Sequence, residues 1–148
     1  MKKLSKNMIF CLNYSNVHAS LIKKIDGALS PHGISFTEYL VLYHLYNAQL
    51  QNGSSGSMRR IDLAESVGLS ASGITRLIAP MEKIGLVQKQ VKERDARVSL
   101  VKITKAGGDI FEHAGTSFDH AAAYLLGGLD AKELDSGLKL LRLLGGKI

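Results

Sequence analysis

Apolar and polar positions follow a helical period along most of this chain, which predicts a mostly α-helical protein. Residues 6–29 carry apolar side chains at helical spacing, and the Ser-Pro-His-Gly run at 30–33 ends that helix. A second helix is expected to begin after Ser35, because Ser35 and Glu38 have the spacing of a capping box. Its broad apolar face predicts a central core helix.

The next pattern is a short helix over 61–67, a tight turn and a longer helix over 71–83, which together predict a helix-turn-helix. Gly68 stands where a helix commonly ends in a left-handed residue, and Ser70 is a good N-cap for the second helix. The apolar positions expected to face inward are Leu63, Ala64, Val67, Ile74, Leu77, Ile78 and Met81.

The opposite face of the second helix has the chemistry of a DNA-reading surface. It carries Ser72, Gly73, Thr75 and Arg76. Small polar side chains with one cation suit a helix that enters the major groove, where base edges present donors and acceptors. A helical hairpin with a merely solvated polar face is the alternative. Pro80 lies inside the same helix and removes one backbone N–H, so we expect a kink or a tightened last turn.

Two β-branched runs follow, 86–91 and 98–103, and they predict a β-hairpin wing with a charged tip. The basic side chains of this tip are Lys89, Lys92, Arg94 and Arg97. Such a tip can lie along a phosphate backbone or enter a minor groove. We assign Asp95 to orienting a neighbouring arginine through a charge-assisted hydrogen bond. A tip whose charges are only solvated is the alternative, and the adjacent helix-turn-helix favours DNA binding.

Two further helices are predicted after the hairpin, one capped by Thr104 and one that begins with a capping box of Asp130 and Glu133. Together with the first helix they place more apolar surface at the chain ends than a helix-turn-helix of this size needs. This surplus predicts an intertwined two-fold dimer, in which two recognition helices meet half-sites about one helical turn apart. Packing within the monomer alone is the alternative.

The predicted fold is therefore mostly α with a small β-hairpin wing. We expect a single domain over 1–148, in which residues 1–33 and 108–148 form dimerisation helices. Residues 34–107 then form a winged helix-turn-helix lobe that binds DNA.

Composition and charge agree with this prediction. The 148 residues include 19 basic and 13 acidic side chains, a net charge of +6, which favours an anionic partner such as nucleic acid. The single cysteine, Cys11, excludes an internal disulfide framework and fits a reducing compartment. No apolar run is long enough for a secretion signal or a membrane span, so we expect a cytoplasmic protein.

The sequence carries no pattern typical of an enzyme or a metal site. It has no Gly-rich phosphate loop, no nucleophile elbow and no paired carboxylates in an apolar setting. The five histidines have no helical ligand spacing, so no metal or other cofactor is expected. We expect His18 and His44 to be partly buried polar residues. A winged helix used only for protein–protein assembly is an alternative function, against which the basic tip argues because protein interfaces deplete lysine.

Over nearly its full length the chain resembles the MarR family of winged-helix transcriptional regulators. The matching segments are Leu63-Ala64-Glu65, Gly68-Leu69-Ser70, Ile74-Thr75-Arg76-Leu77, Met81-Glu82-Lys83, Gly85-Leu86-Val87, Asp95, Arg97, Val101, Ile103-Thr104 and Gly107. The family's wing commonly reads Asp-Arg-Arg, and here Ala96 replaces the first arginine. The resemblance implies a homodimer built from the terminal helices, with Arg97 at the minor groove. It places these residues at the major groove: Ser70, Ser72, Thr75 and Arg76.

The resemblance also implies a regulatory ligand. The family's usual sensing site is a cleft between the dimer helices and the DNA-binding lobe, which takes small aromatic or phenolic compounds. Residues that could line such a cleft are Tyr14, Tyr39, Tyr43 and Phe118. Aromatic residues at this spacing also serve as core. Peroxide-sensing relatives use a cysteine near the position of Cys11, but its apolar neighbours predict a buried structural cysteine, with a redox switch as the alternative.

The sequence thus predicts a dimeric, sequence-specific regulator of transcription that binds double-stranded DNA at a pseudo-palindromic operator. We expect a repressor that a small-molecule effector releases.

Overall fold

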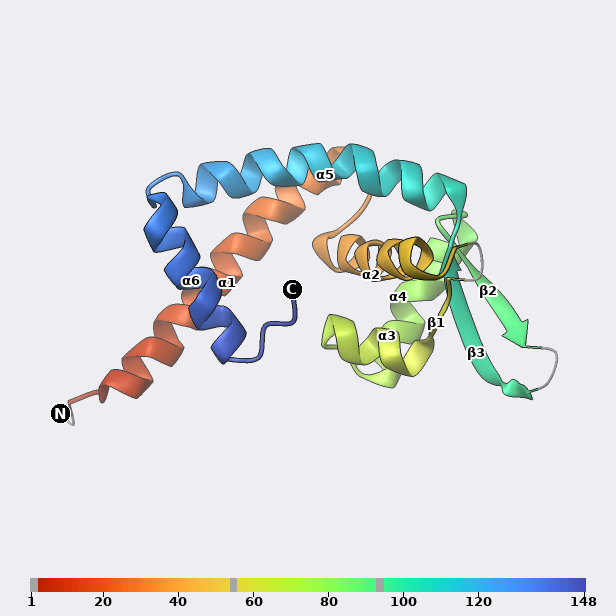
Figure 1. Ribbon diagram of the computed structural model, residues 1–148, viewed down its shortest axis with the longest axis horizontal. Coiled ribbons are helices and arrows are strands. Elements are labelled where there is room, and N and C mark those ends of the chain that lie inside the picture. The colour runs from red at the N-terminus through yellow and green to blue at the C-terminus, as the bar shows by residue number, and fades with distance from the viewer. Residues whose placement is uncertain (1–2, 54–55, 93–94) are drawn as a thin grey trace.

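The computed structural model describes residues 3–53, 56–92 and 95–148, and side chains outside 91–98. The elements in chain order are α1 (Lys6–Leu29), the 3-10 helix η1 (Ser30–His32), α2 (Phe36–Asn52), β1 (Met58–Arg59), α3 (Arg60–Val67), α4 (Ala71–Lys83), β2 (Val87–Lys92), β3 (Asp95–Ile103), α5 (Lys105–Leu126) and α6 (Ala131–Leu143). The predicted mostly helical fold with a small wing is confirmed. Helix α5 joins the strand end of the molecule to the end formed by α1 and α6 (Figure 1).

Polar side chains begin the helices where the sequence places them. At α2 the Glu38 N–H donates to Ser35 Oγ at 3.2 Å, and the Ser35 N–H donates to Glu38 Oε2 at 2.7 Å. The same reciprocal pair joins Asp130 and Glu133 at α6. Both predicted capping boxes are confirmed, so the helix starts are set by local hydrogen bonds.

The hydrophobic core lies in the lobe formed by α2, α3, α4, the sheet and the first half of α5. Its largest fully buried side chains are Ile25 and Leu29 at the end of α1, together with Val41, Leu42, Leu45, Leu63, Ile74, Ile78, Met81, Val87 and Val101. Helix α1 contributes buried residues only near its C-terminus, and α6 buries none. In the part of the chain that the structure describes, no helix is long and apolar enough to cross a bilayer.

The wing belongs to a three-stranded antiparallel sheet of order β1-β3-β2. The predicted hairpin is confirmed, with Val87 opposite Ile103 and Val91 opposite Ser99. The sequence did not predict β1, which consists of two residues and pairs Met58 with Val101 on the far edge of β3. This third strand ties the start of α3 to the wing.

A close approach of two backbones joins the wing to α5. Thr104 Oγ1 accepts from the Gly107 N–H at 3.0 Å and donates to the Gly85 carbonyl at 2.6 Å. The Thr104 N–H donates to the Leu86 carbonyl at 3.1 Å. A Cβ on Gly107 would lie 2.1 Å from that Leu86 oxygen, so the contact requires glycine.

We expect Gly107→Ala to destabilise the fold by about 1–3 kcal/mol, because the added methyl must push α5 away from the turn before β2. Gly108→Ala is the matched control: its Cβ would meet no atom closer than 4.0 Å, and alanine raises helix propensity by up to about 1 kcal/mol. Urea unfolding at one protein concentration measures the free energy of unfolding of both variants. Equal changes in this free energy for Gly107→Ala and Gly108→Ala would contradict the proposed close approach.

His44 joins α2 to the C-terminal end of α3, where it is half-buried as the sequence predicted. Burial lowers the pKa of His44 from its ordinary value of 6.5, a hydrogen bond to the Ser66 backbone opposes this, and nearby Lys147 adds to it. The charged side chains around the same cavity are those of Glu65 and Lys147. The fold therefore favours neutral His44.

Because the folded pKa of His44 is lowered, the unfolded chain takes up this proton first as pH falls. The contribution of neutral His44 to stability should be complete above pH 6.5, the ordinary value, and decline as pH falls from there towards 5. Unfolding free energies at pH 7.5 and 5 should differ less in His44→Gln than in the native protein. The same change at exposed His120 is the control; identical pH dependence in the native protein and His44→Gln would exclude this role.

Candidate nucleic-acid interface

The N-terminal half of α4 presents the polar face that was predicted from the sequence. Ser72, Thr75 and Arg76 are exposed and Gly73 is half-buried, while Ile74 is buried on the opposite side. The hydrophobic stripe therefore fixes the rotation of α4 about its axis, and the polar residues face away from the core.

The hydroxyl groups on this face are held in defined positions. Ser70 Oγ accepts from the Gly73 N–H at 3.0 Å and lies 3.2 Å from Ser72 Oγ. Thr75 Oγ1 donates to the Ala71 carbonyl at 3.0 Å, so its lone pairs remain free to accept. Arg76 is exposed and forms no ion pair with a described residue, so its guanidinium is available to a base edge or a phosphate.

Helix α4 remains one helix from Ala71 to Lys83 with Pro80 inside it. The missing N–H of Pro80 would have bonded to the Arg76 carbonyl, and the helix continues beyond it to an Ile84 N–H that donates to the Pro80 carbonyl at 3.1 Å. The exposed polar face lies N-terminal to Pro80, so the residues expected to contact DNA lie on regular helix.

The wing is joined to the end of α4 by an ion pair. Lys89 Nζ in β2 lies 3.4 Å from Glu82 Oε2, which partly neutralises the charge assigned to phosphate contact. Lys92, Asp95 and Arg97 lie in the strands β2 and β3, but their side chains fall outside the description. Arg94 lies outside the described residues altogether. The roles assigned to these four positions therefore stay predictions.

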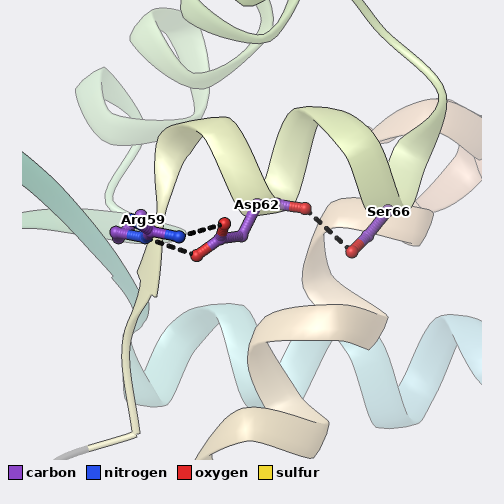
Figure 2. A network of polar contacts seen from close by, with 3 residues as sticks. All are labelled: Arg59, Asp62 and Ser66. Atoms are coloured by element: carbon purple, nitrogen blue, oxygen red, sulfur yellow. Dashed lines mark hydrogen bonds and ion pairs between the residues drawn. The ribbon is translucent and has the colours of Figure 1, made fainter.

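An ion pair that the sequence reading missed fixes the start of the helix-turn-helix. Arg59, the last residue of β1, donates to both carboxylate oxygens of Asp62 at 2.7 and 2.8 Å (Figure 2). The hydrogen bond from Arg59 lowers the pKa of Asp62 and raises that of Arg59. Ser66 Oγ donates to the Asp62 carbonyl at 2.9 Å one turn later. The three-residue spacing of Arg59 and Asp62 was the available signal.

The aromatic residues proposed for an effector cleft do not all lie together. Tyr39 is 8% exposed and stacks on Phe118 with ring centroids 5.1 Å apart, inside the core. Tyr43 is half-buried and lies 6.3 Å from the ring of Phe111 in the same cluster. Tyr14 lies apart on α1, is 51% exposed and stacks on His18.

The prediction that Cys11 is buried is wrong for the single chain, as is the partial burial predicted for His18. Both are exposed on α1, where the described chain buries no residue from 6 to 20. An apolar cavity of about 560 Å³ lies between α1 and the end of α6. Its lining residues are Phe10, Cys11, Tyr14, Leu141, Leu144, Gly145 and Gly146.

Among the described residues, no group of three or more His, Cys, Asp or Glu side chains is placed to hold a metal ion. The candidate interface consists of the α4 face and the wing, which offer hydroxyl groups and basic side chains.

Comparison with known proteins gives the same architecture. The model of the MarR family matches residues 34–99, from the start of α2 into β3. A crystal structure of a mutant MarR from E. coli complexed with operator DNA is 19% identical, with a TM-score of 0.84 over 99% of this chain and 100% of that chain. A MarR family regulator from Rhodococcus sp. RHA1 is 20% identical, with a TM-score of 0.84 over 96% of each chain.

A third structure is Sco3205, a MarR family transcriptional regulator from Streptomyces coelicolor, in complex with DNA. It is 18% identical to this chain, with a TM-score of 0.82 over 97% of this chain and 89% of that chain. At these identities the solved structures establish the fold, and the matched family covers the helix-turn-helix together with most of the wing.

Proposed function

We propose that this chain is a member of the MarR family of winged helix-turn-helix transcriptional regulators, whose model matches residues 34–99. In this proposal it binds double-stranded DNA sequence-specifically as a homodimer and controls transcription. The observation that carries this proposal is the exposed polar half of α4, where fixed hydroxyl groups lie beside the exposed side chain of Arg76. A net charge of +6 and the DNA complexes of two structural neighbours support it.

The homodimer is supported by apolar surface that the described chain leaves uncovered. On α1 the large exposed side chains are Met8, Ile9, Phe10, Leu12, Tyr14 and Val17. On α6 and just beyond it they are Leu134, Leu138, Leu140, Leu141, Leu143 and Leu144. Exposed apolar side chains in this number mark an interface, and α1 and α6 lie at the end of the molecule away from the wing (Figure 1). A second copy covers this surface and leaves both α4 faces free.

We further propose that the protein represses transcription and that a small aromatic or phenolic acid releases it. A cavity of about 420 Å³ lies between the C-terminal part of α2, Met58 and the chain end. Tyr43 lines it with a ring, and Lys147 lines it with a cation. An aromatic ring and a cation are complementary to an aromatic carboxylate, and the volume suits a small molecule.

Selection of the purified protein against random duplex DNA, with its mass measured in solution, tests the proposal. We expect an enriched two-fold symmetric site that is bound by a species of twice the chain mass. Release from that duplex by salicylate-like carboxylates then tests the effector. No enriched sequence, or a monomer that binds DNA only through salt-sensitive contacts, would favour a general DNA-coating or assembly role instead.

Variants of two arginines should separate base reading from phosphate contact. Arg76→Ala should relax preference at one step of the half-site by about 1–3 kcal/mol, because it removes a bidentate donor. Arg97→Ala should weaken binding to all sequences and lower the salt slope by about 1. Lys132→Ala, at the start of α6, controls for loss of charge. Intact preference in Arg76→Ala, or an unchanged salt slope in Arg97→Ala, would remove that residue from the interface.

A further inference from the structure

The last residues of the chain turn back from α6 toward the helix-turn-helix (Figure 1). Gly145 adopts a left-handed φ of 108°, and its N–H donates to the Arg142 carbonyl at 3.1 Å. The Gly146 N–H donates to the Leu141 carbonyl at 2.8 Å. A Cβ on Gly146 would lie 2.9 Å from that oxygen, so the two glycines allow the chain to reverse at this point.

Beyond this turn the chain reaches α3. Lys147 Nζ lies 3.7 Å from Glu65 Oε1, and Ile148 accepts at its carbonyl from Arg142 Nε at 3.4 Å. Lys147 and Ile148 also line a cavity of about 330 Å³ with His44 of α2. The four residues 145–148 thus bond to the end of α6 and to α3, and they share a cavity with α2.

We propose that residues 145–148 act as a strap that holds α3 to α6 of the same chain and thereby sets the position of the recognition helix relative to the dimer helices. Helix α6 buries none of its own side chains, so the strap supplies a connection that the helix itself lacks. The Leu69 N–H donates to the Ala64 carbonyl across the turn, so α4 follows any displacement of α3. The effect on DNA binding rests on the function proposed above.

The strap is weak enough to be adjustable. The side chains of Lys147 and Glu65 are 74% and 78% exposed, so their attraction is screened by water and salt. Loss of such a pair changes an equilibrium by about two- to fivefold. A ligand or a change in salt of modest effect could therefore shift the lobe between held and released positions.

A zero-length carbodiimide cross-linker tests the contact directly, since it joins a carboxylate to an amine only where the two touch. We expect a Glu65–Lys147 cross-link by mass spectrometry, beside the Lys105–Asp109 pair at 3.0 Å as a positive control. In a mixture of ¹⁴N- and ¹⁵N-labelled chains, the link should join residues of equal label. Absence of this link, or a link that joins different labels about as often as equal ones, would overturn a strap within one chain.

Charge reversal tests the consequence. The Kd of Lys147→Glu for the selected duplex should be two- to fivefold higher than the Kd of Lys139→Glu. The control Lys139→Glu makes the same charge change on α6, at a residue without an ion pair among the described residues. Adding Glu65→Lys to Lys147→Glu should restore the Kd. Equal Kd values in Lys147→Glu and Lys139→Glu would overturn the coupling. If the native protein selects no duplex, the DNA-binding proposal fails. The cross-link still shows whether residues 145–148 hold α3 to α6 of the same chain.

Discussion

The hydroxyl of Thr104 holds together three elements on which the arrangement of the DNA-binding lobe depends. Thr104 directly follows β3. Its hydroxyl caps α5 and also donates to the Gly85 carbonyl in the turn that joins α4 to β2. Gly107 lets the Leu86 carbonyl approach the first turn of α5, where any side chain would separate them. Because α5 runs from this junction to the terminal helices, the contact connects α4 and the wing to the other end of the molecule (Figure 1).

The helices at the two ends of the chain bury fewer of their apolar side chains than the lobe that contains this junction. The lobe buries its apolar side chains in one cluster, whereas the first half of α1 and all of α6 remain exposed along their apolar stripes. Exposed stripes of this length are costly in water, so they favour association with a like surface. The fold thus separates a well-packed lobe from terminal helices with exposed apolar side chains, which is the surface that the proposed homodimer would cover.

Signals that lie within a few residues of one another were sufficient to predict most of this fold. Ser35 with Glu38, Gly68 and Ser70 act through local hydrogen bonds and backbone preference, and α4 begins and ends as its stripe indicates. Features set by distant partners were not predictable in the same way. Strand β1 exists because Met58 meets Val101, and periodicity placed Cys11 on an apolar face without indicating whether anything within the chain covers that face. The side chains at the wing tip stay a prediction for the same reason.

The composition of the reading face argues for two copies acting together. Its N-terminal half offers hydroxyl groups and one guanidinium, and the nearby Lys89 is already paired with Glu82. One bidentate contact discriminates between bases by about 1–3 kcal/mol, whereas specific DNA binding exceeds non-specific binding by about 4–10 kcal/mol. A single α4 face therefore supplies too little discrimination to select one site in a genome. In the proposed homodimer, two such faces at a fixed separation, with phosphate contacts from two wings, would reach that range. The apolar ends of the chain would then contribute to sequence recognition without touching DNA.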